Sequence, residues 1–176
     1  MTAPTTPVLR ADWRFALRSP WHLLATGFGS GLSPVAPGTA GSLFGWAVYA
    51  LLLQQQPALT LWPLLLLGFA VGVPACSRAA RALGTDDPSA LVWDEVIGIW
   101  LVLALLPAAG SAPLWMQLLG FALFRLFDAV KRGPVGWVDR HLKGGWGIML
   151  DDLVAALLAA AVLRAGLALG GAWDGL

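Results

Sequence analysis

Long apolar stretches constrain the fold of this chain more than any other feature. Five of them stand out, at about residues 39–56, 58–76, 96–109, 114–127 and 153–169. A helix needs about 20 apolar residues to cross a bilayer core, so the third and fourth stretches are short for that purpose. Only 12% of the residues are charged, against about 25% in a soluble domain. These features predict an all-α, polytopic membrane bundle of about five apolar helices, with four spans as the alternative.

The segments between and before these stretches carry turn and surface signals. Residues 54–57 and 107–113 contain prolines at the points where two stretches must connect, which is typical of tight turns. Near the N-terminus, basic and apolar residues recur together at helical spacing: Arg10, Trp13, Arg14, Leu17, Arg18 and Trp21. Such a pattern suits a helix lying on a membrane surface. We expect an amphipathic, interfacial segment over residues 1–26 and a membrane domain over residues 27–176.

The charges are distributed unevenly across a five-span arrangement. The N-terminus and the segments 77–95 and 128–152 then share one side, which holds all of the 11 lysines and arginines except Arg125 and Arg164. Positive residues in short loops mark the cytoplasm, so this side is predicted to be cytoplasmic. The same side holds a group of acids that topology does not require: Asp86, Asp87, Asp94, Glu95, Asp128, Asp139, Asp151 and Asp152. A net charge of +1 gives no polybasic surface for nucleic acid.

Several of these acids stand in motifs that can carry chemistry. Asp94 and Glu95 adjoin the third apolar stretch, and Asp151 and Asp152 follow a glycine-rich run and adjoin the fifth. Acids at the start of a helix also interact favourably with the helix dipole. Each pair therefore has a purely structural interpretation beside the functional one. Carboxylates from separate elements on one face are the ligands that magnesium prefers beside a phosphate. We therefore expect a shared Mg²⁺ site.

Two further groups lie near these acids in the sequence. Arg125, Asp128 and either Lys131 or Arg132 have helical spacing and would lie along one face of a helix. This arrangement suits either a salt bridge at the membrane edge or an acid for a metal with cations for a phosphate. Asp139 is followed directly by Arg140, which by itself is typical of a solvated charge pair.

A glycine-rich segment over residues 27–42 precedes the first apolar helix. Such loops can bind phosphate through backbone N–H groups at a helix N-terminus, although an ordinary connecting segment has the same composition. Ser33, Thr39 and Ser42 lie in this segment and can donate hydrogen bonds. No Gly-Lys-Ser/Thr follows, so the pattern does not indicate a nucleotide-binding P-loop.

The residues that other phosphatase mechanisms require are not present in the necessary arrangement in this sequence. Cys76 and Arg81 stand one residue too close for a cysteine phosphatase, and as the lone cysteine Cys76 excludes an internal disulfide or a cysteine-built metal site. His22 and His141 are the only histidines, and neither stands in the context that a histidine nucleophile needs. Metal-assisted attack by water is the phosphatase mechanism that remains after these exclusions.

Taken in order, residues 27–42, 92–98, 124–131 and 144–152 resemble the successive motifs of the phosphatidylglycerophosphatase A family. The resemblance implies Mg²⁺-dependent removal of the terminal phosphate of phosphatidylglycerophosphate at the cytoplasmic face of the bacterial inner membrane. One departure is Arg132, where the family usually has proline; an arginine there either adds a contact to phosphate or changes the shape of the turn.

Residues and resemblance together give one hypothesis for the site. The metal ligands are predicted to be Asp94, Glu95, Asp128, Asp151 and Asp152, with Asp139 next among the catalytic acids and one acid serving as general base. Arg125 and Lys131 are predicted to neutralise the substrate phosphate, with Ser33, Thr39 and Ser42 donating hydrogen bonds to it. The alternatives are a small transporter or channel, which the nearly uncharged span centres disfavour, and a phosphatase of another lipid such as phosphatidic acid.

Overall fold

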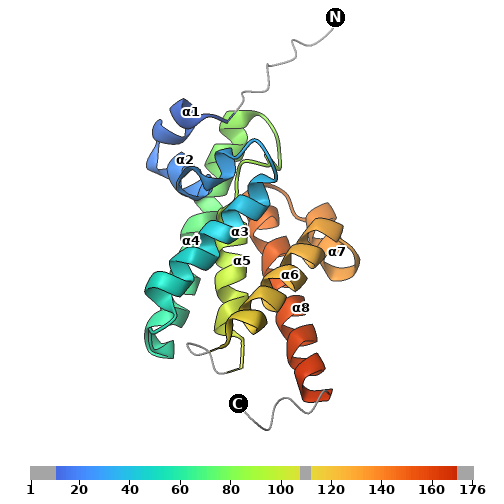
Figure 1. Cartoon of the computed structure of the whole chain (residues 1–176). Coiled ribbons are helices and arrows are strands. Elements are labelled where there is room, and N and C mark those ends of the chain that lie inside the picture. The colour runs from blue at the N-terminus through green and yellow to red at the C-terminus, as the bar shows by residue number, and fades with distance from the viewer. Residues whose placement is uncertain (1–10, 108–111, 170–176) are drawn as a thin grey trace, which may run out of the picture.

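The computed structural model describes residues 11–107 and 112–169, and these residues form helices without a strand among them (Figure 1). The predicted all-helical class is thus confirmed for the described part of the chain. In chain order the elements are α1 (Trp13–Leu17), α2 (Pro20–Ala25), a 3₁₀ turn (Gly27–Leu32), α3 (Pro37–Val48) continuing into a π-helical turn (Tyr49–Leu53), α4 (Ala58–Leu83), α5 (Trp93–Ala104), α6 (Leu114–Val130), α7 (Gly133–His141) and α8 (Gly144–Leu169).

Helix α5 is the centre of the bundle. It packs against α3, α4, α6 and α8, and every residue from Trp93 to Leu103 is buried (Figure 1). Its 12 residues rise only about 18 Å, less than the roughly 30 Å of a bilayer core. Three of its neighbours, α4, α6 and α8, are longer than α5, which accounts for the burial of acids at its end.

Two helices among the described residues are long and apolar enough to cross a membrane. These are α4 and α8, with 26 residues each, and the apolar helix over Pro37–Leu53 is shorter. Large apolar side chains on α4, including Leu59, Leu66 and Leu67, are exposed, which suits a lipid environment. Two candidate spans support association with a membrane, and the count of five spans stays a prediction.

Helices α4 and α8 cross closely because a glycine stands at the crossing. The amide of Gly145 donates a hydrogen bond to Ser77 Oγ at 3.0 Å. A Cβ at Gly145 would lie 2.0 Å from the carbonyl oxygen of Val73, so only glycine permits this approach. Gly145, which belongs to the glycine-rich run before Asp151, thus permits the close packing of α8 against α4.

The described part of the N-terminal segment forms two short helices. Asp12 caps α1 by accepting a hydrogen bond from the Phe15 amide, and Ser19 caps α2, whose first residue is Pro20. A new cap followed by proline starts a new helix, which divides the segment in two. Arg10 lies outside the described residues, as do residues 108–111 of the second predicted turn.

Candidate functional site

A cavity of about 270 Å³ at the start of α5 brings together most of the predicted site residues. The first turn of α3, the α4–α5 loop, α5, the C-terminal end of α6 and α8 all contribute to its wall. The charged residues that line it are Asp87, Asp94, Glu95, Arg125, Asp128, Lys131, Asp151 and Asp152. Seven of these eight were predicted from sequence motifs as site residues, and Asp87 was not.

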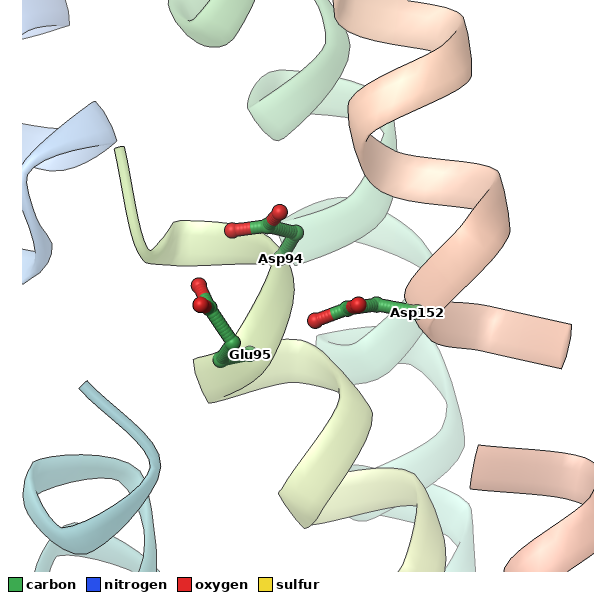
Figure 2. Close-up of side chains that lie close together, drawn as sticks. All are labelled: Asp94, Glu95 and Asp152. Atoms are coloured by element: carbon green, nitrogen blue, oxygen red, sulfur yellow. The ribbon is translucent and has the colours of Figure 1, made fainter. Parts of the chain in front are cut away.

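Three carboxylates converge at the base of this site. Asp94 and Glu95 project from α5 and Asp152 from α8, and Figure 2 shows the three groups pointing toward one another. One oxygen from each lies within 4.8 Å of the others. Asp94 is 8% exposed, Glu95 9% and Asp152 2%. Among the residues that the structure describes, no hydrogen-bond partner reaches Asp94 Oδ1, Glu95 Oε2 or Asp152 Oδ2.

Such a cluster needs positive charge when its members are ionised. Two unit charges 4.8 Å apart repel by about 3 kcal/mol at an effective dielectric constant of about 20. Burial adds a desolvation cost for each charge unless it is paired or coordinates a metal. The cation nearest to the trio is Arg125, whose NH1 atom lies 3.8 Å from Glu95 Oε1. The trio therefore has the donors, the burial and the unsatisfied oxygens of a site for a hard divalent cation.

Arg125 joins three of the elements around the cavity. Its NH1 atom donates to Asp128 Oδ2 at 2.5 Å and to Ser42 Oγ at 3.4 Å, besides approaching Glu95. The i, i+3 pairing with Asp128 confirms that these two residues share a helix face. Asp128 thereby fixes the orientation of a guanidinium that borders the acidic trio.

Lys131 is held by carboxylates from three other elements. Its Nζ atom donates to Asp139 on α7 and to Asp151 on α8, each at 2.7 Å, and lies 3.7 Å from Asp87 in the α4–α5 loop. Burial alone would lower the pKa of the Lys131 ammonium, but the two hydrogen bonds outweigh it and raise that pKa above its usual range. Lys131 is thus a fixed cation already surrounded by acids.

The five predicted metal ligands therefore fall into two classes. Asp94, Glu95 and Asp152 have unsatisfied oxygens in one cluster, whereas Asp128 is paired with Arg125 and Asp151 with Lys131. The sequence placed Asp151 and Asp152 at a helix start, and the structure corrects this, because α8 begins at Gly144. Seven residues of helix rise about 10 Å, so both side chains reach the cavity from inside the bundle.

The predicted hydroxyl donors are placed less favourably. Ser33 is not among the residues lining the cavity, and its Oγ donates to the carbonyl of Val35. Ser42 is buried, and its Oγ donates to the carbonyl of Gly38. Thr39 lies in the first turn of α3 beside Gly38, which does line the cavity. Asp139 does not line the cavity, but it accepts a hydrogen bond from Lys131, which does.

Two residues of the site were missed at the level of sequence. Asp87 was counted among the acids of the predicted cytoplasmic side but was given no role in the site. Its side chain is 59% exposed although it lies beside Lys131. Gly38 was one glycine among several in its segment. A Cβ there would lie 2.4 Å from Glu95 Oε1 and 2.9 Å from Arg125 NH2, so the backbone itself forms part of the wall.

Comparison with known proteins gives a consistent result. A family model described as phosphatidylglycerophosphatase A matches residues 23–167. The chain is 42% identical to phosphatidylglycerophosphatase A of Escherichia coli over 156 residues, covering 87% of each chain. It is 40% identical to the enzyme of the same name from Haemophilus influenzae over 153 residues, covering 86% of this chain and 91% of the other.

A further relative carries a different name. The chain is 40% identical over 139 residues to a Bacteroides thetaiotaomicron protein named as a proposed phosphatidylinositol-3-phosphatase, covering 77% of this chain and 86% of the other. No solved structure matches the chain.

Proposed function

This chain belongs to the phosphatidylglycerophosphatase A family, a family of phosphatases, and from this membership we propose that it hydrolyses the terminal phosphate of phosphatidylglycerophosphate to give phosphatidylglycerol. Water attacks the terminal phosphorus, the bond to the glycerol oxygen breaks, and the products are inorganic phosphate and the lipid alcohol. The observation that carries the proposal is the trio of buried carboxylates, each with one oxygen that has no hydrogen-bond partner among the described residues, in one cavity with Arg125.

Asp94, Glu95 and Asp152 fit a divalent cation, and we propose Mg²⁺. Their unsatisfied oxygens are hard donors from two helices that face a common point. When bound there, such an ion supplies charge stabilisation to the phosphoryl oxygens. Asp128 and Asp151 complete the predicted ligand set, but their ion pairs with Arg125 and Lys131 make the trio the core of the site.

The protein's own groups then position the substrate and the proton. Arg125 is a fixed guanidinium beside the trio, and it neutralises charge on the transferred phosphoryl group. Asp128 and Asp151 line the same cavity, and one of them accepts the proton of the attacking water. Because the cavity lies at the ends of α5 and α6, the headgroup can enter it while the acyl chains stay in lipid.

A binding measurement tests the metal part of this proposal without relying on turnover. Mn²⁺ takes the same carboxylate ligands as Mg²⁺ and is detected by electron paramagnetic resonance. We expect wild-type protein to bind Mn²⁺, Mg²⁺ to compete for the site, and Asp152→Asn to weaken binding by at least about tenfold. Equal binding by Asp152→Asn would remove Asp152 from the ligand set.

A second candidate is hydrolysis of a different phospholipid monoester. The Bacteroides relative named for a phosphoinositide favours this alternative, and phosphatidic acid is another lipid with a terminal phosphate. The metal cluster and Arg125 would serve each of these substrates in the same way, so only a comparison of substrates separates them.

We further propose a multi-pass inner-membrane location with the cavity facing the cytoplasm. The support is the clustering of lysines and arginines on the side of the chain that carries the acids. Cysteine labelling tests this topology, because the native Cys76 is fully buried. We expect an impermeant maleimide to label Asp86→Cys only in inverted membrane vesicles and Gln55→Cys only in right-side-out cells. The reverse pattern would place the cavity on the periplasmic side.

A further inference from the structure

The first turn of α3 has backbone amides without a hydrogen-bond acceptor in the part of the chain that the structure describes. The residue before the helix is Ala36, in the left-handed conformation with φ 46°, and it supplies no side-chain cap. Pro37 has no N–H, and neither Gly38 nor Thr39 has a hydrogen-bond acceptor for its amide among the described residues. The first in-helix amide with a partner is that of Ala40, which donates to the carbonyl of Ala36. The N-terminus of α3 is therefore an uncapped positive end.

This helix end opens into the acidic cavity. Ala36, Pro37 and Gly38 all line it. A Cβ at Gly38 would fall among Glu95 Oε1 and the two terminal nitrogens of Arg125, at 2.4, 2.9 and 3.2 Å. Gly38, Arg125 and the acidic trio thus border one small volume, and Thr39 follows Gly38 in the same turn of α3. Independently of the helix, one buried oxygen of each trio member (Asp94 Oδ1, Glu95 Oε2 and Asp152 Oδ2) has no hydrogen-bond partner within the described residues, which indicates that a ligand belongs there.

Two of the three side-chain hydroxyls predicted to bind phosphate, those of Ser33 and Ser42, are engaged elsewhere. The Ser33 hydroxyl donates to the Val35 carbonyl at 2.8 Å, and the Ser42 hydroxyl donates to the Gly38 carbonyl at 2.9 Å. Each would have to break an internal hydrogen bond before donating to a substrate. Lys131 is likewise surrounded by three carboxylates. Unpaired amides that need no such exchange are available on Gly38 and Thr39.

We propose that the phosphate group of the substrate is bound by the N–H groups of Gly38 and Thr39 at the start of α3, together with Arg125. This inference rests on the proposed phosphatase function and names the groups that recognise its phosphomonoester. The ligand must carry negative oxygens, because it faces a helix N-terminus and a guanidinium, and the neighbouring carboxylate trio would hold a cation. Gly38 must lack a side chain because a Cβ would occupy the space of the guanidinium and of Glu95.

Proline substitution tests the amides directly, since it removes an N–H and is tolerated in the first turn of a helix. We expect Thr39→Pro to raise both KM for phosphatidylglycerophosphate and the inhibition constant of inorganic phosphate by about tenfold, with Mn²⁺ binding retained. Thr39→Ala keeps the amide and is expected to cost much less. Leu59→Pro is the matched proline control, because Leu59 lies in the first turn of α4 and its side chain is exposed.

A second pair of variants tests the space around Gly38. We expect Gly38→Ala to lower kcat/KM by at least about tenfold, whereas Gly166→Ala, where a Cβ meets nothing within 4 Å, leaves it unchanged. If wild type is active and Thr39→Pro matches it, or if Thr39→Ala loses as much as Thr39→Pro, the inference is overturned and the proposed function stands. If wild type releases no phosphate from any phospholipid monoester, the proposed function itself fails.

Discussion

Asp94→Asn is expected to reduce phosphate release by at least about 100-fold while the protein stays folded. Asp94 Oδ1 is buried and has no partner among the described residues, and it faces Glu95 and Asp152. Asparagine has nearly the same shape but only one oxygen and no charge, so a metal ligand is lost. Even the mutation of a residue that only supports a metal ligand typically lowers metal affinity or activity by about 10–100-fold.

Stability measurements separate this loss from misfolding. Removing one of three crowded charges relieves repulsion, so without metal the melting temperature of Asp94→Asn should equal or exceed that of wild type. Mg²⁺ should raise the melting temperature of wild type, because a ligand that binds only the folded state stabilises it, and this increase should be absent from the variant. Asp86→Asn, an exposed acid outside the cavity wall, is the matched control. Near-normal turnover by Asp94→Asn would exclude Asp94 from the metal site.

Arg125→Lys is expected to lower kcat/KM by about 10–100-fold although it preserves the charge. The guanidinium contacts Asp128, Ser42 and Glu95 together. The ammonium group of a lysine cannot reproduce the planar arrangement of N–H donors that makes these contacts. Hydrogen bonds to charged groups contribute about 1.5–3 kcal/mol, which corresponds to the expected range.

The same variant distinguishes phosphate binding from metal binding. Mn²⁺ affinity should change little in Arg125→Lys, because the trio's oxygens remain, whereas inhibition by inorganic phosphate should weaken. Arg164→Lys is the matched control. Arg164 lies on α8, does not line the cavity, and donates a hydrogen bond to the carbonyl of Leu105, just after the C-terminal end of α5. A variant with unchanged phosphate inhibition would contradict the role of Arg125.

The helices of this protein were largely predictable because their signal is local. Apolar stretches and prolines located α4 and α6 to within a few residues of their N-terminal ends. The start of α8 was missed because Gly144 and Gly145 look like a loop, whereas tight packing on α4 makes them helical. The burial of α5 was also not predictable, since its length gives no sign that four helices surround it.

The composition of the site was predictable, but its internal organisation was not. Adjacent acids such as Asp94 and Glu95 were visible as pairs in the sequence. Which acids stay unpaired depends on contacts between distant segments, such as Lys131 with Asp87 and Asp151. A backbone contribution from Gly38 carries no side-chain signal at all, so it emerged only from the packing of α3 against Glu95 and Arg125.

The central claim, a metal-dependent phosphatase of phosphatidylglycerophosphate, is tested most directly by phosphate release from the purified protein in detergent. Phosphatidylglycerophosphate, phosphatidic acid and phosphatidylinositol 3-phosphate would each be supplied with Mg²⁺ and with EDTA. We predict release that is much faster from phosphatidylglycerophosphate than from the other two lipids and is lost with EDTA. Faster release from another lipid would contradict the substrate, and undiminished release in EDTA would contradict the metal site.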